Sequence, residues 1–252
     1  MNYKTIIANN FSKAAKTYDE YAVFQNNLAQ TLKQKILNSR CAADTVLDIG
    51  TGTGTLALEL AKIFPKAAIH GCDIADGMLD VARKKSAAID NFVCVRADAE
   101  HLPYKNNVFS IVASSAALHW ASSLPAAILE LTRVLAAGGR LFATFMVRGT
   151  LFELHDSLNT NPFLPEKKQL LGIIENCGLC KIESFQIEEK IYYKSPRELL
   201  LSLKRTGTNY SRGAAAKKTL SRALDVYKKK YAGNSGIPAT FKALLIKAEN
   251  EN

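Results

Sequence analysis

The chain has 252 residues, a length that suits one α/β domain with an additional lobe. Hydrophobic residues make up 48% of the chain, which is enough for a buried core. No apolar run approaches the ~20 residues of a membrane helix, and the N-terminus shows no signal peptide, so no membrane association is expected. Five scattered cysteines, an odd number, fit a reducing compartment, and we expect a cytoplasmic protein.

The net charge of +10 is concentrated in one late segment, whereas the front half of the chain is close to balanced. Between Lys194 and Tyr231 the only acidic residues are Glu198 and Asp225. Such an excess of positive charge suits a nucleic acid, an anionic membrane or an acidic protein partner. The cations of this segment are Lys194, Arg197, Lys204, Arg205, Arg212, Lys217, Lys218, Arg222, Lys228, Lys229 and Lys230.

In the front part of the chain, predicted strands alternate with predicted helices. Residues 11–40 are expected to be helical because their apolar side chains recur at helix-like spacing. Short apolar strands are expected at residues 45–49, 67–72, 92–95, 109–114 and 140–146. Helices are expected at residues 55–64, 76–85 and 126–135, the last of them ended by Gly138 and Gly139. This alternation predicts a mostly parallel sheet that helices cover on both faces.

The rest of the chain has a different pattern. We expect a helix at residues 166–177, a strand at 181–193, two basic helices within 196–231 broken near 206–209, and a strand at 240–247. The late strands add an antiparallel edge, so the predicted fold is a doubly wound, mostly parallel, seven-stranded α/β sheet with a helical insertion. The expected division is an N-terminal helical segment (1–40), a core domain (41–195 with 237–252) and a basic insertion or lid (196–236).

The strongest motif is a glycine loop after the first strand, where Asp48 is followed by Gly50, Gly52 and Gly54. Glycines at such a turn let the backbone approach a ligand closely and reach dihedral angles that other residues avoid. A dinucleotide loop has the spacing GxGxxG, and here Thr55 stands where its third glycine belongs. A carboxylate at Asp48 would repel a diphosphate and attract an ammonium group. The loop therefore favours a phosphate-free nucleoside cofactor with an ammonium and a sulfonium.

Acidic residues also follow the next two strands. Asp73 lies about twenty residues past the loop, a position from which acids accept hydrogen bonds from ribose hydroxyls. Asp98 follows the third strand, where an adenine edge would lie, and would accept a hydrogen bond from the adenine amino group. Helix capping is the alternative role for both. Residues 114–120 would border the far end of the cofactor, with His119 a candidate to bond a substrate oxygen and Trp120 a candidate pocket wall.

These residues resemble the class I S-adenosylmethionine-dependent methyltransferases. The flanking segments are similar to one family among them, the malonyl-acyl carrier protein O-methyltransferases of biotin synthesis. Two positions depart from the usual pattern, Thr51 where the superfamily often has Cys and His119 where relatives often carry Gln. The narrower likeness rests on residues 11–19, 117–120, 149–154, 161–163 and 203–207. The cofactor-binding residues that it implies are Asp48, Gly50, Thr51, Gly52, Gly54, Asp73, Ile74, Met78, Asp98, Ala99 and Ser114.

The resemblance implies methyl transfer to the free carboxylate of a malonyl group on an acyl carrier protein. A carboxylate, with an ordinary pKa of ~4, is already the nucleophile at neutral pH, so no general base is predicted. A cation should orient it, with Arg148 the first candidate and Lys204 and Arg205 the others. Tyr18 and Tyr21 would close the N-terminal segment over the cofactor. The basic segment would offer a complementary surface to an acidic carrier protein.

Several alternatives stay open on the sequence alone. A methyltransferase of the trans-aconitate type would act on a small free acid. An NAD-dependent dehydrogenase is disfavoured by Asp48 and Thr55, and a nucleic-acid methyltransferase by the lack of an Asn-Pro-Pro-Tyr motif after the fourth strand. A non-catalytic cofactor-binding module is a further alternative. No metal is expected, because Cys177 and Cys180 form a lone CxxC pair without nearby histidine. No nucleic-acid partner is expected either.

Overall fold

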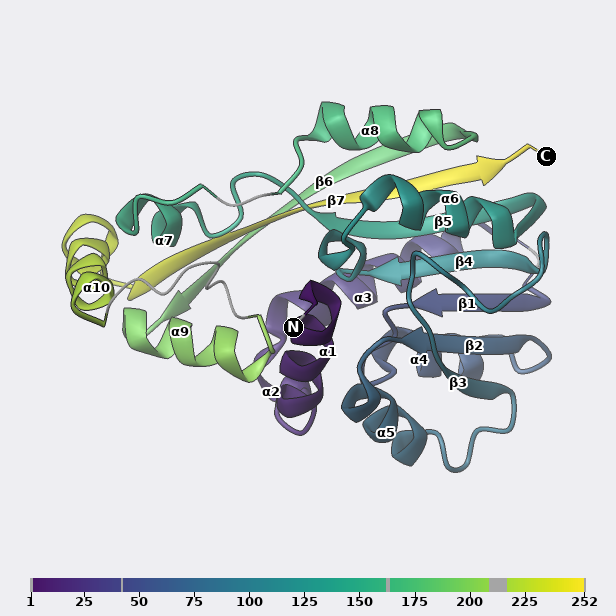
Figure 1. Cartoon of the computed structure of the whole chain (residues 1–252), viewed down its shortest axis with the longest axis horizontal. Helices are drawn as coiled ribbons and strands as arrows, with labels where there is room; N and C mark the ends of the chain where they lie inside the picture. The colour runs from purple at the N-terminus through teal and green to yellow at the C-terminus, as the bar shows by residue number, and fades with distance from the viewer. Residues whose placement is uncertain (1, 42, 162–163, 209–216, 252) are drawn as a thin grey trace.

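The computed structural model describes residues 2–41, 43–161, 164–208 and 217–251. Within these residues, seven strands form one sheet in the order β3-β2-β1-β4-β5-β7-β6 (Figure 1). β7 runs antiparallel to both of its neighbours, β5 and β6, and the other pairs are parallel. The predicted fold class, a doubly wound and mostly parallel sheet with an antiparallel edge, is confirmed.

The strands are short where the sheet is parallel and long at its antiparallel edge. They are β1 (Thr45–Ile49), β2 (Ala68–Asp73), β3 (Phe92–Arg96), β4 (Phe109–Ser115), β5 (Leu135–Met146), β6 (Leu179–Tyr193) and β7 (Ile237–Asn250). The helices are α1 (Tyr3–Ala14), α2 (Tyr18–Tyr21), α3 (Val23–Asn38), α4 (Thr55–Ile63), α5 (Asp76–Lys85), the 3-10 helix η1 (Leu118–Trp120), α6 (Leu124–Val134), α7 (Phe152–Ser157), α8 (Lys167–Asn176), α9 (Pro196–Arg205) and α10 (Lys217–Tyr231).

Two apolar layers hold the sheet between helices. On one face, Leu32 of α3 and Leu60 of α4 are fully buried against strand residues such as Ile111. On the other face, Leu131 of α6 and Ile174 of α8 pack in the same way. Because the central strands are buried on both faces, they need apolar residues at nearly every position, which explains why their sequences lack a two-residue alternation.

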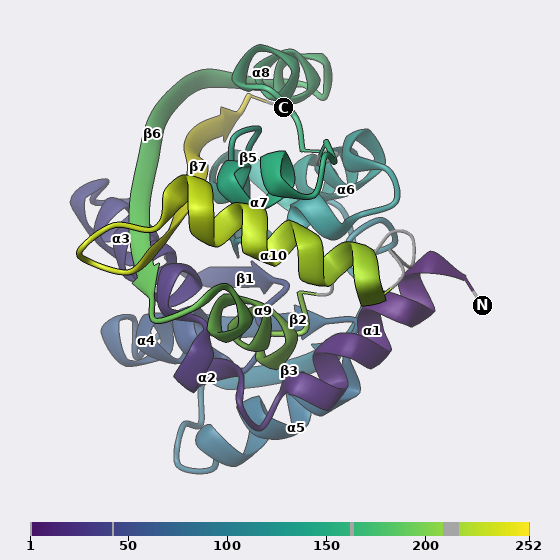
Figure 2. The same ribbon diagram turned by 90° about the vertical axis from the view of Figure 1, so that its left-hand side faces the viewer.

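A third apolar cluster lies beyond the carboxyl ends of the parallel strands. There, α7, α9 and α10 pack on the first half of β7, with Tyr227 of α10 fully buried. Figure 2 looks onto this end and shows α10 beside α7 and α9. The carboxyl ends of β1, β2 and β4 point toward α1 and α2 in Figure 1.

Some element boundaries differ from the sequence-based expectation. α6 ends at Val134 and β5 begins at the next residue, so Gly138 and Gly139 lie within the strand rather than after a helix. Leu135 of β5 pairs with Phe109 of β4, and Arg140 pairs with Ile111. The register shift between these two pairs accommodates the glycines. The short helices α7 and η1 were not predicted. Pro162 and Phe163 of the family-like segments, and residues 209–216 of the expected insertion, lie outside the described residues.

Among the described residues, no helix has both the length and the apolarity to cross a lipid bilayer. The cysteines in this part of the chain are all free thiols. Cys177 is buried in the apolar layer under α8, and the Cys180 thiol donates to the carbonyl of Glu249. Within the described residues, no group of three or more potential ligands is placed to hold a metal ion.

Candidate active site

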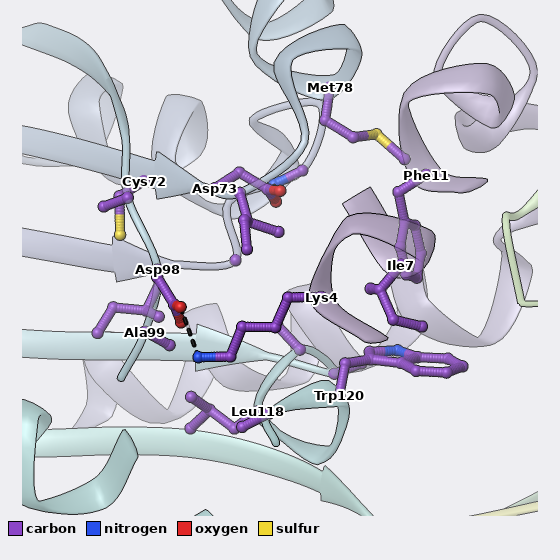
Figure 3. A pocket seen from close by; sticks show the side chains of 18 of the residues that line it. Lys4, Ile7, Phe11, Cys72, Asp73, Met78, Asp98, Ala99, Leu118 and Trp120 are labelled. Atoms are coloured by element: carbon purple, nitrogen blue, oxygen red, sulfur yellow. Dashed lines mark hydrogen bonds and ion pairs between the residues drawn. The ribbon is translucent and has the colours of Figure 1, made fainter. Parts of the chain in front are cut away.

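The main cleft lies at the carboxyl ends of β1, β2, β3 and β4, where ligands bind in open α/β sheets. It encloses about 820 Å³, including solvent at its mouth. α1 forms the wall opposite the strands, and Figure 3 shows Lys4, Ile7 and Phe11 pointing from it into the space. The strand side of the lining is formed by Ile49, Gly50, Gly52, Cys72, Asp73, Ile74, Met78, Ala97, Asp98, Ala99, Glu100 and residues 115–118.

The glycine loop forms one end of this cleft. Gly50, Gly52 and Gly54 have φ angles of +69°, +57° and +86°, in the left-handed region that only glycine enters without strain. The N–H groups of Gly50 and Thr51 donate to the carbonyl of Cys72 at 2.8 and 2.9 Å, which ties the loop to β2. A Cβ atom on Gly50 would overlap that of Ala117, so two loops meet here without space for a side chain.

Asp48 lies beneath the loop, with only 1% of its surface exposed. Its Oδ2 accepts a hydrogen bond of 2.8 Å from the Thr51 hydroxyl, and its Oδ1 is buried and has no partner in the described part of the chain. Burial raises the pKa of Asp48 to about 7, and repulsion from Asp73 adds to the effect. An unpaired buried carboxylate oxygen is costly, which is why burial favours the protonated form of Asp48.

The raised pKa of Asp48 makes a prediction about stability and pH. The pKa of Asp48 in the folded state, about 7, is above its value in the unfolded state. Its contribution to the free energy of unfolding is therefore fully present below the unfolded pKa and is lost as pH rises through 7. The Asp48→Asn variant does not ionise. We therefore expect the melting temperature of the variant to rise relative to that of the ligand-free wild type as the pH increases from 5 to 8. Thermal unfolding at each pH measures this difference. A constant difference between the two proteins would contradict the burial of an ionisable group here.

Asp73 and Asp98 occupy the two middle strand ends. The two carboxylate oxygens of Asp73 accept from the N–H groups of Gly52, at 3.0 Å, and Ala75, at 2.8 Å. Asp98 accepts from Lys4 Nζ at 2.6 Å, and Lys4 also pairs with Glu100 at 3.0 Å. Figure 3 shows this ion pair spanning the cleft from α1. Both acids thus fulfil a structural role while their side chains still line the cleft, where further lone pairs remain for a ligand.

A smaller side pocket adjoins the main cleft. The two share Phe11, Tyr18, Ala116 and Trp120, and the rings of Phe11 and Trp120 meet edge to face at 5.5 Å. The side pocket encloses about 430 Å³, including open space. Its other lining residues come from α3, η1, the end of β5, the segment leading into α7, the end of α9 and β7, and they are Gln25, His119, Met146, Thr150, Leu151, Leu203, Thr208 and Phe241.

The sequence of this chain is similar to those of methyltransferases. A family model described as a methyltransferase domain matches residues 47–143. A malonyl-acyl carrier protein O-methyltransferase of Geobacter sulfurreducens is 30% identical, over 93% of this chain and 94% of that protein. The chain belongs to the malonyl-acyl carrier protein O-methyltransferase family. It is therefore a methyltransferase that uses S-adenosylmethionine.

Two solved structures show the same fold. The YcgJ protein from Bacillus subtilis covers 88% of this chain and 99% of its own, with a TM-score of 0.66 and 23% identity. Phosphoethanolamine N-methyltransferase 2 of Haemonchus contortus, solved in complex with S-adenosyl-L-methionine, covers 87% of this chain and 52% of its own, with a TM-score of 0.57 and 20% identity. The Rossmann-like methyltransferase fold expected from the sequence is thus confirmed.

The cleft residues suit the donor of this family. Gly50 leaves room for close backbone approach, whereas Asp48 is buried beneath the loop and is absent from the lining of the cleft. Asp73 and Asp98 line the cleft where the resemblance implies ribose and adenine, and Ile74, Met78 and Ala99 line the same walls. When bound, S-adenosylmethionine supplies an electrophilic methyl group.

Other expected cofactor residues are placed differently. Ser114 is fully buried and donates to the carbonyl of Ile49, so it joins β4 to β1 and does not line the cleft. Its neighbour Ser115 lines the cleft instead, with a buried hydroxyl that has no partner in the described residues. Thr51 is buried and holds Asp48, and Gly54 is the N-cap of α4. These two residues shape the loop and are absent from the lining.

The candidate substrate residues divide into two groups. Tyr18, His119 and Trp120 line the side pocket, as a substrate role requires. Arg148 lies outside both pockets, with 52% of its side chain exposed and a 2.6 Å ion pair to Glu166. Tyr21 lies outside both as well, and its carbonyl accepts from the Ser202 hydroxyl. Lys204 and Arg205 are exposed on α9 and line neither pocket.

Most of the residues that sequence reasoning missed come from the N-terminal helix and from distant segments. Lys4 and Ile7 of α1, Gln25 of α3 and Phe241 of β7 gave no local signal, because their role depends on contacts with remote parts of the chain. Phe11, Thr150, Leu151 and Leu203 are exceptions, since they lie in segments that resemble the family.

Proposed function

We propose that this enzyme transfers the methyl group of S-adenosylmethionine to the free carboxylate of malonyl-acyl carrier protein, giving the methyl ester that serves as primer in biotin synthesis. The observation that carries the proposal is the extent of the likeness to the Geobacter sulfurreducens relative, 93% of this chain. A match of that length extends far beyond residues 47–143, the part that the methyltransferase domain model matches.

The arrangement of the two pockets supports this chemistry. They meet at Tyr18 and Trp120, so an acceptor in the side pocket lies next to a donor in the main cleft. A carboxylate with an ordinary pKa of ~4 is ionised at neutral pH and needs no general base. The protein's contribution is to position the two reactants and to exclude water, which the aromatic walls formed by Phe11, Tyr18 and Trp120 favour.

The acceptor class can be tested by comparing substrates. We expect the highest kcat/KM with malonyl-acyl carrier protein, a lower value with malonyl-CoA, and little turnover of trans-aconitate. The measurement is the rate of methyl-ester formation with each acceptor at one concentration of S-adenosylmethionine. Preference for trans-aconitate would instead favour a methyltransferase of small free acids.

We propose that the acyl carrier protein docks on the basic surface around the end of α9. Lys204 and Arg205 are exposed there, between Leu203 and Thr208 of the side pocket, and neither forms an ion pair within the described residues. The Arg205 carbonyl accepts from the Thr17 hydroxyl at 3.0 Å, so this surface is held beside the N-terminal segment. Acyl carrier proteins are acidic, and charge complementarity favours encounter.

We also propose that residues 196–236 act as a lid and that the enzyme works in the cytoplasm.

Reversing the two charges tests this docking surface. The double variant Lys204→Glu with Arg205→Glu should raise KM for malonyl-acyl carrier protein by roughly tenfold, because opposed charges become like charges, and should change KM for malonyl-CoA less. The matched control is Lys167→Glu with Lys168→Glu, which reverses two exposed charges on α8 that line neither pocket. Equal effects on both substrates, or an equal effect of the control, would reject this docking site.

A further inference from the structure

The side pocket holds polar side chains that the protein itself leaves without partners. Tyr18, Gln25, His119 and Trp120 line it, and within the described residues none of these side chains forms a hydrogen bond. The Nδ1 atom of His119 is among the buried atoms that lack a partner. Each side chain carries an O–H or N–H donor. Buried polar groups are normally paired, so the unpaired ring nitrogen of His119, with three further side chains around it that have no protein partner, indicates a polar ligand in this pocket.

All of these donors are uncharged. Burial lowers the pKa of His119 to about 3, so its ring is neutral at pH 7 and carries one N–H. Burial also raises the pKa of the Tyr18 hydroxyl, which therefore keeps its proton. Among the described residues, no lysine, arginine, aspartate or glutamate lines the side pocket. The remaining walls are largely apolar, with Met146, Leu203 and Phe241.

Resting on the proposed function, we propose that the acceptor carboxylate is held in the side pocket by neutral donors alone, with the amide of Gln25 and the imidazole of His119 as its positioning residues. Both residues line the side pocket without lining the main cleft, whereas Tyr18 and Trp120 line both. A carboxylate has about four lone-pair sites, so several donors can bind it at once. The ligand class is a short acyl chain that ends in a carboxylate.

A neutral site suits the charge change in this reaction. The carboxylate oxygen is the nucleophile, and a direct ion pair with a buried cation would reduce its electron density. After methylation the acceptor is a neutral ester, so a buried cation would be left unpaired, which is strongly destabilising. Neutral donors can bond first to the carboxylate and then to the ester carbonyl. The pocket can therefore release the product without leaving a buried charge.

A matched pair of variants distinguishes this arrangement from a cation-held carboxylate. Gln25→Met keeps the side-chain length and removes the amide, and should lower kcat/KM for the carboxylate acceptor about ten- to hundredfold. Arg148→Met removes the expected cation, which already pairs with Glu166, and should leave kcat/KM within about twofold of the wild type. Affinity for S-adenosylhomocysteine, measured by calorimetry, should stay unchanged in both and verifies folding. Loss of activity in Arg148→Met with normal activity in Gln25→Met would overturn the inference.

His119 provides a second, independent test. His119→Phe removes the ring N–H and should lower kcat/KM as Gln25→Met does, whereas His119→Gln restores a neutral donor and should recover most of it. Equal activity of the two variants would remove His119 from the site. The variants are assayed on whichever acceptor the wild type esterifies, malonyl-acyl carrier protein or trans-aconitate. If the wild type esterifies trans-aconitate alone, the proposed substrate is wrong but the test of the neutral donors still applies. If it esterifies neither acceptor, both the proposed function and this inference are contradicted.

Discussion

Replacing Gly50 with alanine is expected to lower the affinity for S-adenosylhomocysteine roughly a hundredfold, the largest effect of any single change in the loop. Two physical terms add. The residue has a φ of +69°, which strains any side chain, and its new Cβ would overlap the Cβ of Ala117. The segment after β4 must then move away from the loop, and Ala116, Ala117 and Leu118 of that segment line the cleft. Isothermal titration calorimetry measures the affinity directly.

Gly138 offers a matched control for this variant. Its φ is +68°, nearly that of Gly50, but a Cβ built on it meets nothing within 4 Å. Gly138→Ala should therefore show the backbone strain, a loss of about 1–2 kcal/mol, without any change in ligand affinity. If Gly50→Ala and Gly138→Ala bound the ligand with equal affinity, the close contact between the loop and Ala117 would have no part in shaping the site.

Removing the carboxylate of Asp73 is the second change with a large expected effect. Asp73→Ala should weaken binding of S-adenosylhomocysteine by about 1–3 kcal/mol, since it removes an acceptor for the ribose hydroxyls. The same change also frees the N–H groups of Gly52 and Ala75, so loss of loop order contributes to the effect. The measurement is the dissociation constant by calorimetry, at a temperature well below the melting point of the variant.

Asp76 is a suitable comparison for Asp73. It lies in the first turn of α5, is exposed, and pairs with Arg96 at 3.3 Å without lining the cleft. Asp76→Ala should leave the dissociation constant within about twofold, because an exposed ion pair contributes little. Unchanged affinity in Asp73→Ala would reject the ribose-binding role, and a comparable loss in both variants would show that the effect is a general one on α5.

The parallel half of the sheet was predictable because its signals are local. β1 begins and ends at the predicted residues, and so does α5, since short apolar runs alternate there with amphipathic segments and turn residues. The glycine loop was equally clear, because its spacing and its place between a strand and a helix occur within a few residues. The start of β5 was misplaced at Arg140, because the glycine pair suggested a break between helix and strand, whereas β5 begins at Leu135 and pairs there with β4.

The acceptor side of the site was less predictable because distant segments build it. Gln25, His119 and Phe241 meet in one pocket although more than a hundred residues separate the last two. Lys4 reaches Asp98 across 94 positions of sequence. Arg148 seemed a good cation for the substrate because it follows β5, but Glu166 pairs with it. The local sequence shows which residue types are present. It does not show which of them form ion pairs or hydrogen bonds with distant segments.

Mass spectrometry of intact malonyl-acyl carrier protein, after incubation with this enzyme and S-adenosylmethionine, tests whether the methyl group is transferred to the free carboxylate. We predict that the carrier gains the mass of a single methylation on its malonyl group, and that a carboxylesterase removes the methyl group because it is a carboxyl ester. No mass gain on the malonyl form, or a gain that survives ester hydrolysis, would contradict methyl transfer to the free carboxylate.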